Sequence, residues 1–289
     1  MDVDLDAQEA PAGEGLGPGV ALRPQSLMLT FLGTYILDRD LSVYSGSVID
    51  VFARTGIGEH AARSTLSRMV NRGLLQRTKH GRKMYFGLTE RSARILRDGA
   101  ERIWRVGAVN RDWDGTWTMV AFSLPEAWQR QRHDLRSRLA WAGFGPLLGG
   151  LWIAPGPVDV TAAVAELGLE DHVKVFRATA APALDAARMV RETWDLAALA
   201  DRYRGFAERW RLDEAAPPPH DPLRVKLLLF TEWLQLVRGD PRLPLDLLPA
   251  DWPAGHAQEV FRSVNAIVDE PAAAMVADLL DTVPAEPGG

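Results

Sequence analysis

The 289-residue sequence predicts an α+β protein with several domains. Three observations predict this class. The chain exceeds the ~100–200 residues of one typical domain. Its first two thirds alternate between helical and strand patterns, whereas its last third has helical periodicity throughout. Apolar residues make up 47% of the chain, which is enough for several cores. Cysteine is absent from the sequence, which excludes disulfide scaffolds, cysteine nucleophiles and cysteine-ligated metal sites.

The N-terminal segment, residues 1–22, carries five acids, four glycines and no base. We expect it to be a disordered acidic tail, because glycine and acidic residues dominate its composition. It resembles neither a secretory signal nor a transit peptide. No stretch of the chain approaches the ~20 apolar residues that span a bilayer. The sequence therefore predicts a cytoplasmic protein.

A helical pattern begins at Pro24 and continues to Leu37. The next expected elements are helix 48–54, helix 59–72, strand 74–78, a turn at 79–82, strand 83–88 and helix 92–104. The residues expected to cap or end these helices are Ser47, Gly73 and Thr89. Alternation along the second strand places Met84 and Phe86 on one face and Lys83 and Tyr85 on the other. A helix–turn–helix followed by a two-stranded hairpin and a helix is the order of a winged-helix domain, which we place at 23–106.

The second module, residues 112–181, is predicted to have the order β-α-β(β)-α-β, in which the strand in parentheses has no assigned residues and completes the β-α-β-β-α-β order of a ferredoxin-like domain. Its expected elements are strand 116–124, a helix from Pro125 to Ala142, strand 151–154, helix 158–167 and strand 172–178. This order over about 70 residues is typical of a ferredoxin-like α+β sandwich. From residue 183 to the end of the chain the pattern is helical, and we expect an all-α C-terminal domain over 183–280.

The formal net charge of −5 is unevenly distributed along the chain. Residues 23–106 contain 15 Lys+Arg against 7 Asp+Glu, a net charge of +8, and the rest of the chain is acidic. A basic module within an acidic chain is typical of a domain that binds a polyanion. The alternative interpretation is a solvated helical surface whose arginines have no binding role.

The helix expected at 59–72 has two different faces. Its apolar stripe consists of Ala62, Leu66, Met69 and Val70. The opposite face carries small polar and cationic side chains, which suit a helix that lies in the major groove of DNA and contacts base edges. These candidate DNA-binding residues are His60, Arg63, Ser64, Ser67, Arg68 and Asn71.

The turn between the two expected strands is cationic. Lys79, Arg82 and Lys83 lie at or beside the tip, where the wing of a winged helix contacts phosphates or enters the minor groove. The alternative is an exposed strand edge that charge protects from pairing. Because the helix and the hairpin occur in the order of a winged helix, we predict that both contact double-stranded DNA. The protein is then expected to be associated with the nucleoid.

The sequence contains few other motifs of binding or catalysis. Residues 56–61 fit a loose G-x-G-x-x-A dinucleotide fingerprint, but no strand precedes them and no acid follows about 20 residues later. Walker A and G-x-S-x-G sequences are absent, and the six histidines show no metal-ligand spacing. We therefore predict no enzyme activity, no cofactor and no metal site.

Several segments carry a resemblance to one protein family. They are 62–70 (ARSTLSRMV), 73–75 (GLL), 81–89 (GRKMYFGLT), 113–118 (WDGTWT), 143–147 (GFGPL), 194–196 (WDL), 203–206 (YRGF) and 240–253 (DPRLPLDLLPADWP). On these segments, the chain resembles the PaaX family of bacterial repressors of phenylacetic-acid degradation. The run 240–253 is the most specific part, because a generic winged helix would not share it.

The resemblance implies a homodimeric repressor with a winged helix, a ferredoxin-like middle domain and a helical C-terminal domain. It implies that an aryl-acyl-CoA such as phenylacetyl-CoA releases the protein from the operator of an aromatic-acid catabolic operon. A dimer places two recognition helices about one DNA turn apart, which predicts a palindromic operator. Mapped onto this chain, Arg63, Ser64 and Arg68 contact bases. Arg82 and Lys83 belong to the wing.

A CoA ester needs arginines for its phosphates beside an aromatic surface for its acyl group. The residues that offer this mixture, and that we expect to bind the effector, are Arg188, Arg191, Trp194, Arg202, Tyr203 and Arg204. Alternatively, the aromatic side chains among them form the core stripe of a helix whose arginines face water.

The alternative function is that of a metal-dependent nuclease or an RNA-binding protein, with the ferredoxin-like domain as the working part. That domain resembles the small metal-dependent nucleases of CRISPR adaptation, which place an acid at the end of the first strand. Here the first strand ends in Ala121-Phe122-Ser123-Leu124, without an acid, which argues against cleavage.

Overall fold

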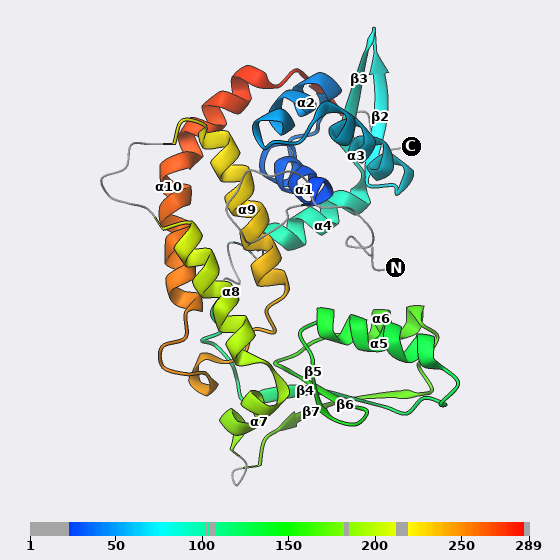
Figure 1. Cartoon of the computed structure of the whole chain (residues 1–289). Helices are drawn as coiled ribbons and strands as arrows, with labels where there is room; N and C mark the ends of the chain where they lie inside the picture. The colour runs from blue at the N-terminus through cyan, green and yellow to red at the C-terminus, as the bar shows by residue number, and fades with distance from the viewer. Residues whose placement is uncertain (1–22, 102, 104–107, 182–184, 212–218, 286–289) are drawn as a thin grey trace. The chain divides into compact units, whose positions relative to one another are not determined.

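The computed structural model describes residues 23–101, 103, 108–181, 185–211 and 219–285 (Figure 1). Both helices and antiparallel sheets are present, so the predicted α+β class is confirmed. The chain divides into two compact units. The middle unit contains Val106–Arg204 and Leu236–Ala257. The N-terminal unit contains the described residues before these, together with Gly205–Gln235 and Gln258–Gly289. The helical residues of the last third are therefore shared between the two units.

The N-terminal unit begins with α1 (Pro24–Tyr35), α2 (Ser45–Arg54), α3 (Glu59–Asn71) and α4 (Glu90–Glu101). Helix α2 begins earlier than predicted, and the expected N-cap role of Ser47 is wrong. Ser47 lies inside α2, where its hydroxyl accepts a hydrogen bond from a backbone N–H near the C-terminus of the chain. The last helix of the predicted winged-helix domain was expected to end at residue 104, which lies outside the described residues.

Helix α3 ends as the sequence predicts, with Gly73 in the left-handed conformation at a φ of 67°. The N–H of Gly73 donates to the carbonyl of Val70, and the N–H of Leu74 donates to the carbonyl of Met69, both at 2.9 Å. This pair of bonds is a Schellman motif, which satisfies two carbonyls of the last helical turn. The motif lets the chain turn directly from α3 into the following strand.

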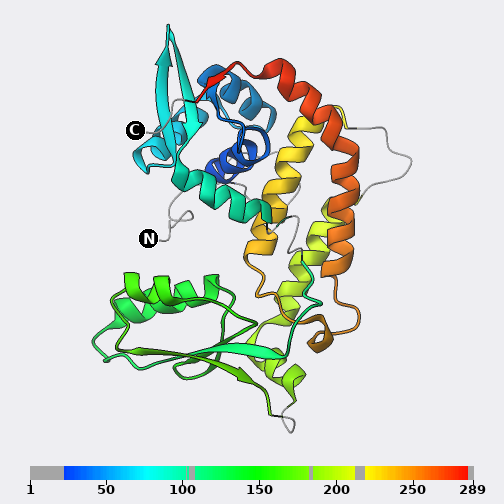
Figure 2. The ribbon, with the colours of Figure 1, turned by 180° about the vertical axis from the view of Figure 1, so that it is seen from behind.

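A four-stranded antiparallel sheet joins segments from the two ends of the described chain (Figures 1 and 2). It comprises β1 (Leu41–Tyr44), β2 (Leu75–His80), β3 (Lys83–Leu88) and β8 (Thr282–Pro284), in the order β2-β3-β1-β8. The prediction that the chain is helical from residue 183 to its end is wrong for β8. Three residues show no periodicity of their own, and pairing with β1 is what makes them a strand.

The core of the N-terminal unit also receives side chains from α9 (Pro222–Arg238) and α10 (Ala254–Leu279). Those contributed by α9 and α10 are Leu223, Leu227, Leu228, Ala272 and Val276. They belong to the same buried cluster as Phe31 of α1, Phe52 of α2 and Leu66 of α3. Full burial of one leucine contributes roughly 1.5–3 kcal/mol. Most of α9 and most of α10 are therefore structural parts of the N-terminal unit.

The middle unit contains the second four-stranded antiparallel sheet. Its strands are β4 (Thr116–Phe122), β5 (Gly145–Leu148), β6 (Leu151–Pro155) and β7 (Val173–Thr179), in the order β5-β6-β4-β7. Helix α5 connects β4 to β5, and helix α6 connects β6 to β7. This order and these crossovers fit a ferredoxin-like fold, as the sequence predicts.

Helices α5 (Gln129–Trp141) and α6 (Thr161–Glu166) cover one face of this sheet (Figure 1). The buried side chain of Leu135 on α5 belongs to the same core as Val120 of β4. Helix α5 begins later than predicted, because the residues that follow Pro125 form a turn before it.

The opposite face of the sheet is packed by α7 (Ala186–Thr193), α8 (Leu196–Arg209) and the short 3-10 helix η2 (Leu245–Leu247). The buried residues of this second core are Trp117, Ile153, Val190 and Leu243. The indole of Trp117 stacks on that of Trp194, with the ring centres 6.3 Å apart and the planes at 24°. Leu243 belongs to the run 240–253, which is the most specific part of the family resemblance. That run therefore packs within the middle unit.

Candidate nucleic-acid interface

Helix α3 presents one buried and one solvent-facing side. Ala62, Leu66 and Met69 are buried, as the apolar stripe predicts, and Thr65 is buried with them. Val70, which the stripe also includes, packs partly buried against the same core. The helix is thereby held to α1 and α2, and its polar residues are left on the outer side.

The predicted DNA-binding residues of α3 lie on that outer side. His60, Arg63, Ser67 and Asn71 are exposed, and Ser64 and Arg68 are partly buried. Their accessibility is what contact with bases requires, because a base edge in the major groove is reached only by a side chain that protrudes from the helix.

Two arginines of α3 have defined partners. The Nε of Arg63 donates to a carboxylate oxygen of Glu59 at 2.8 Å, across one exposed turn of the helix. The Nη1 of Arg68 donates to the Ser64 hydroxyl at 2.8 Å, and its Nη2 donates to the Thr65 hydroxyl at 3.1 Å. The two hydroxyl contacts orient the guanidinium of Arg68.

The hairpin next to α3 has a shorter turn than predicted. His80 pairs with Lys83, so the turn consists of Gly81 and Arg82, and Lys79 lies within β2. Gly81 has a φ of 61°, a conformation that glycine adopts without strain in a two-residue hairpin. Lys79, Arg82 and Lys83 are exposed at this tip.

Two residues beside the hairpin were not predicted as site residues. Arg77 is exposed on β2, two residues before Lys79, and strand alternation in the sequence would have placed both on one face. Asp281, at the C-terminal end, binds Lys83 with an N–O distance of 2.6 Å. No local pattern connects Asp281 with the hairpin, because the two residues are 198 positions apart in the chain.

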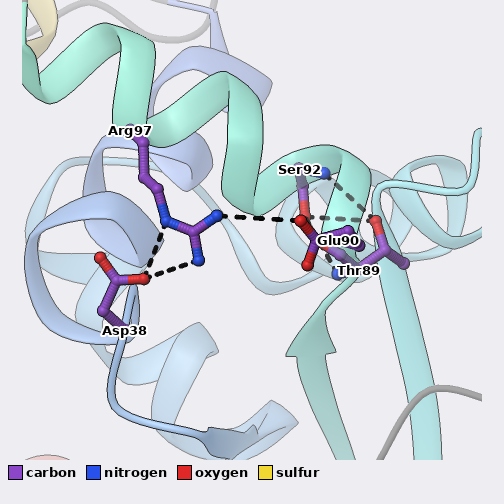
Figure 3. Close-up of polar contacts among 5 residues, drawn as sticks. All are labelled: Asp38, Thr89, Glu90, Ser92 and Arg97. Atoms are coloured by element: carbon purple, nitrogen blue, oxygen red, sulfur yellow. Dashed lines mark hydrogen bonds and ion pairs between the residues drawn. The ribbon is translucent and has the colours of Figure 1, made fainter.

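The base of the hairpin is fixed to the start of α4 by the predicted cap (Figure 3). The Ser92 N–H donates to the Thr89 hydroxyl at 3.3 Å, and the Thr89 N–H donates to the Ser92 hydroxyl at 3.0 Å. The Thr89 hydroxyl also donates to the carbonyl of Gly73 at 2.9 Å. This reciprocal capping connects the end of α3, the end of β3 and the start of α4 at one point.

Further along α4 from this cap, Arg97 forms an ion pair with Asp38 (Figure 3). The guanidinium of Arg97 donates through Nε and Nη2 to one oxygen of Asp38, at 3.0 and 2.8 Å. The contact raises the pKa of Arg97 and ties α4 to the loop that follows α1.

The predicted effector residues lie on α7, just after it, and on α8. Three of the arginines pair with exposed carboxylates. The pairs are Arg188 with Glu192, Arg191 with Asp185, and Arg204 with Asp201, at N–O distances of 2.8, 3.6 and 3.0 Å. Arg202 donates to backbone carbonyls of Leu236 and Gly239. The partly buried Trp194 packs with the core of the middle unit.

Tyr203 differs from the other predicted effector residues because its side chain is fully buried. Its hydroxyl donates a hydrogen bond to Asp240, and burial beside that carboxylate raises the pKa of Tyr203 well above its ordinary value. Burial also raises the pKa of Asp240, although the hydrogen bond from Tyr203 works in the opposite direction.

The described part of the chain has neither a cluster of metal-ligating side chains nor a helix that could span a membrane. Within it, no group of three or more His, Cys, Asp or Glu side chains is arranged to hold a metal ion. Within the same residues, no helix combines the length and apolar character that crossing a membrane requires.

Three parts of the chain match models of one protein family. Residues 23–92 match the model described as PaaX-like protein, and residues 110–190 match the PaaX protein central Cas2-like domain. Residues 194–278 match the PaaX-like protein C-terminal domain.

Individual proteins give the same result. The chain is 30% identical over 271 residues to the transcriptional repressor PaaX of Escherichia coli (strain K12). The aligned region covers 89% of this chain and 84% of the relative. The solved structure of an uncharacterized protein from Mycobacterium tuberculosis has a TM-score of 0.59 and 23% identity, over 88% of this chain and 98% of the other. At that identity the likeness supports the fold alone. The three matching segments and the relative from Escherichia coli show that this chain belongs to the PaaX family.

Proposed function

We propose that this protein is a DNA-binding transcriptional repressor whose N-terminal unit is a winged helix. In this proposal α2 and α3 are the helix–turn–helix, and β2 and β3 are the wing. The observation that carries the proposal is the outer side of α3, where small polar and cationic side chains are accessible and Glu59 is the sole acid of the helix. The relative from Escherichia coli is a transcriptional repressor, which supports the regulatory role.

Helix α3 enters the major groove in this proposal, and the hairpin contacts the backbone. Arg68 is the strongest candidate for base contact, because the hydroxyls of Ser64 and Thr65 already orient its guanidinium. Lys79 and Arg82 meet phosphates at the hairpin tip. The full set of proposed contacts is His60, Arg63, Ser64, Ser67, Arg68, Asn71, Lys79, Arg82 and Lys83.

The family resemblance supports three further parts of the proposal. The protein acts as a homodimer on a palindromic operator, within the cytoplasm and at the nucleoid. An aryl-acyl-CoA such as phenylacetyl-CoA releases it from the operator of an aromatic-acid catabolic operon. The proposed effector residues are Arg188, Arg191, Trp194, Arg202, Tyr203 and Arg204.

The geometry of α7 and α8 is compatible with this effector set. The exposed ion pairs of Arg188, Arg191 and Arg204 contribute little stability, so a CoA phosphate can replace their carboxylate partners at small cost. Tyr203 is buried, and we assign it a supporting role through Asp240 instead of direct contact.

The test is a fluorescence-anisotropy titration of the full-length protein with the DNA upstream of its own gene, at ~150 mM salt. A random fragment of equal length is the control, and each titration is repeated with phenylacetyl-CoA. Preferential binding that the ester reverses supports both the repressor and the effector. Preferential binding without reversal supports the repressor and contradicts this effector. Equal binding to both fragments contradicts autoregulation, and a selection from random DNA then tests the repressor itself.

A further inference from the structure

Asp281 reaches the hairpin from the C-terminal end of the chain. Its carboxylate accepts a hydrogen bond from the ammonium of Lys83 at 2.6 Å and another from the hydroxyl of Tyr85 at 3.1 Å. Its backbone N–H donates to the Ser47 hydroxyl at 3.0 Å, and its carbonyl accepts from the N–H of Tyr44 at 2.9 Å. Both the backbone and the side chain of Asp281 are therefore fixed within the N-terminal unit.

The sheet register explains how one residue reaches two strands away. Strand β8 pairs with β1 and places Asp281 beside Tyr44, and β1 pairs with β3 so that Tyr44 lies opposite Tyr85. Lys83 precedes Tyr85 by two residues, so both side chains leave the same face of β3. The carboxylate of Asp281 thus reaches past β1 and binds Lys83 and Tyr85 of β3.

The contact between Asp281 and Lys83 pairs two opposite charges at the surface. The hydrogen bond to Asp281 raises the pKa of Lys83, and the same bond lowers the pKa of Asp281, so both groups are charged at neutral pH. The Lys83 side chain is 51% exposed, and its ammonium lies 4.8 Å from the centre of the Tyr44 ring. Lys83 is therefore accessible to a phosphate, but its charge is already compensated.

We propose that Asp281 is a specificity-determining residue, which compensates the charge of Lys83 at the wing and so limits sequence-independent binding to DNA. This inference rests on the proposed function. A cation that meets a phosphate adds the same affinity to every DNA sequence, whereas a cation held by a carboxylate adds much less. With Asp281 in place, Lys83 fixes β3 to the C-terminal strand and adds little to the phosphate contacts that Lys79 and Arg82 make at the tip.

The experiment compares Asp281→Asn with the wild type in the full-length protein. Affinities for operator and random DNA are measured by anisotropy between 50 and 200 mM salt. One additional phosphate contact steepens the log–log salt slope by about 0.9, which makes the loss of affinity across that range about 3.5-fold larger. We expect this steeper slope on random DNA, tighter binding to random DNA at low salt, and a lower ratio of specific to non-specific affinity.

Three further variants separate charge compensation from a general structural effect. Asp281→Glu keeps the carboxylate and is expected to restore the wild-type slope. Tyr85→Phe removes one hydrogen bond to Asp281 and keeps the ion pair, so its slope is expected to stay unchanged. Lys83→Ala combined with Asp281→Asn is expected to return to the wild-type slope, because Asp281 acts through Lys83. A cooperative thermal unfolding transition in each variant is the control for folding.

A chemical readout tests the ion pair without DNA. Acetylation of Lys83 by acetic anhydride, followed by mass spectrometry, is expected to be faster in Asp281→Asn, because loss of the carboxylate lowers the pKa of Lys83. An unchanged salt slope in Asp281→Asn, with wild-type operator binding intact, overturns the inference and leaves the repressor proposal in place. A wild-type protein that binds no DNA overturns both, whatever the acetylation rates show.

Discussion

The hydroxyl of Tyr203 on α8 donates a hydrogen bond to the carboxylate of Asp240, 37 residues later in the chain. The other carboxylate oxygen accepts from the backbone N–H of Arg242 at 2.5 Å. The side chain of Asn110 in turn donates to the carbonyl of Arg242 at 3.0 Å. Asp240 is the first residue of the run 240–253, so these contacts attach that family-specific run to the body of the middle unit.

The raised pKa of Asp240 predicts a pH dependence of stability. A folded-state pKa above the ordinary value of 3.8 means that the folded protein binds this proton more tightly than the unfolded chain does. The contribution of Asp240 to the free energy of unfolding is therefore greatest below pH 3.8 and is lost as the pH rises through the raised pKa. Urea unfolding at several pH values measures this slope, and Asp240→Asn is expected to remove it.

Tyr203→Phe tests the hydrogen bond itself. The substitution keeps the aromatic ring and leaves a buried acceptor on Asp240 without its donor, which costs about 1–3 kcal/mol of stability. The loss is expected to be larger at pH 7 than at pH 4, because the hydroxyl stabilises the charged form of Asp240. Equal stability of Tyr203→Phe and the wild type at both pH values would show that the bond contributes nothing.

Arg68 and Arg82 are expected to have different roles in DNA binding. Arg68→Ala removes the proposed base contact and should weaken operator binding by about 1–3 kcal/mol, with a smaller effect on random DNA. Arg82→Ala removes a proposed phosphate contact and should weaken binding to both DNAs alike, with a salt slope lower by about 1. Anisotropy titrations on both fragments measure the two effects, and identical profiles for the two variants would contradict this division.

The Thr89 cap is expected to stabilise the N-terminal unit. Thr89→Ala removes the hydroxyl that caps α4 and contacts Gly73, and should lower the free energy of unfolding by about 1 kcal/mol or somewhat more. Thr89→Ser keeps the hydroxyl and is the matched control. Urea denaturation compares the two, and a similar loss in both variants would assign the effect to the lost methyl group instead of the cap.

The buried Lys226 and the exposed Asp269 form an ion pair. Removing the charge of either partner is expected to change the stability by a different amount. The side chain of Lys226 is 6% exposed and that of Asp269 is 60% exposed. Asp269→Asn leaves a buried ammonium without its counter-ion and should destabilise the protein by about 3–5 kcal/mol. Lys226→Met leaves only an exposed carboxylate and fills the same space near the rings of Tyr35 and Phe230, so we expect a much smaller change. Thermal unfolding ranks the variants, and the reverse order would refute the argument.

Removal of the C-terminal strand is expected to destabilise the N-terminal unit. A chain that stops after Leu280 loses Asp281 and β8, exposes the edge of β1, and loses backbone hydrogen bonds to Tyr44 and Asp40. Its melting temperature is expected to fall by several degrees, whereas a chain that stops after Ala285 keeps these contacts and should melt as the full-length protein does. Matching melting curves for the two truncations would contradict a structural role of β8.

Features that depend on neighbours in the chain could be predicted from the amino-acid sequence. The helical period identified the buried and exposed sides of α3, Gly73 identified its end, and Thr89 identified the cap of α4. Strand alternation and helix order were sufficient to predict the ferredoxin-like middle unit. Each of these features is local, because backbone geometry and capping act over a few residues.

Contacts between distant segments form when the chain folds, and the sequence did not predict them. Tyr85 was expected to share a face of its strand with Lys83, but nothing in the sequence indicated that it is 4% exposed and bonded to Asp281. Likewise, α9 and α10 complete the core of the N-terminal unit, and β8 completes its sheet. Long-range strand pairing and shared cores depend on which surfaces meet after folding. Local periodicity does not identify the segment that becomes the partner. The charge balance of the β2–β3 hairpin is set in this way, because the carboxylate that pairs with Lys83 comes from a residue 198 positions away in the chain.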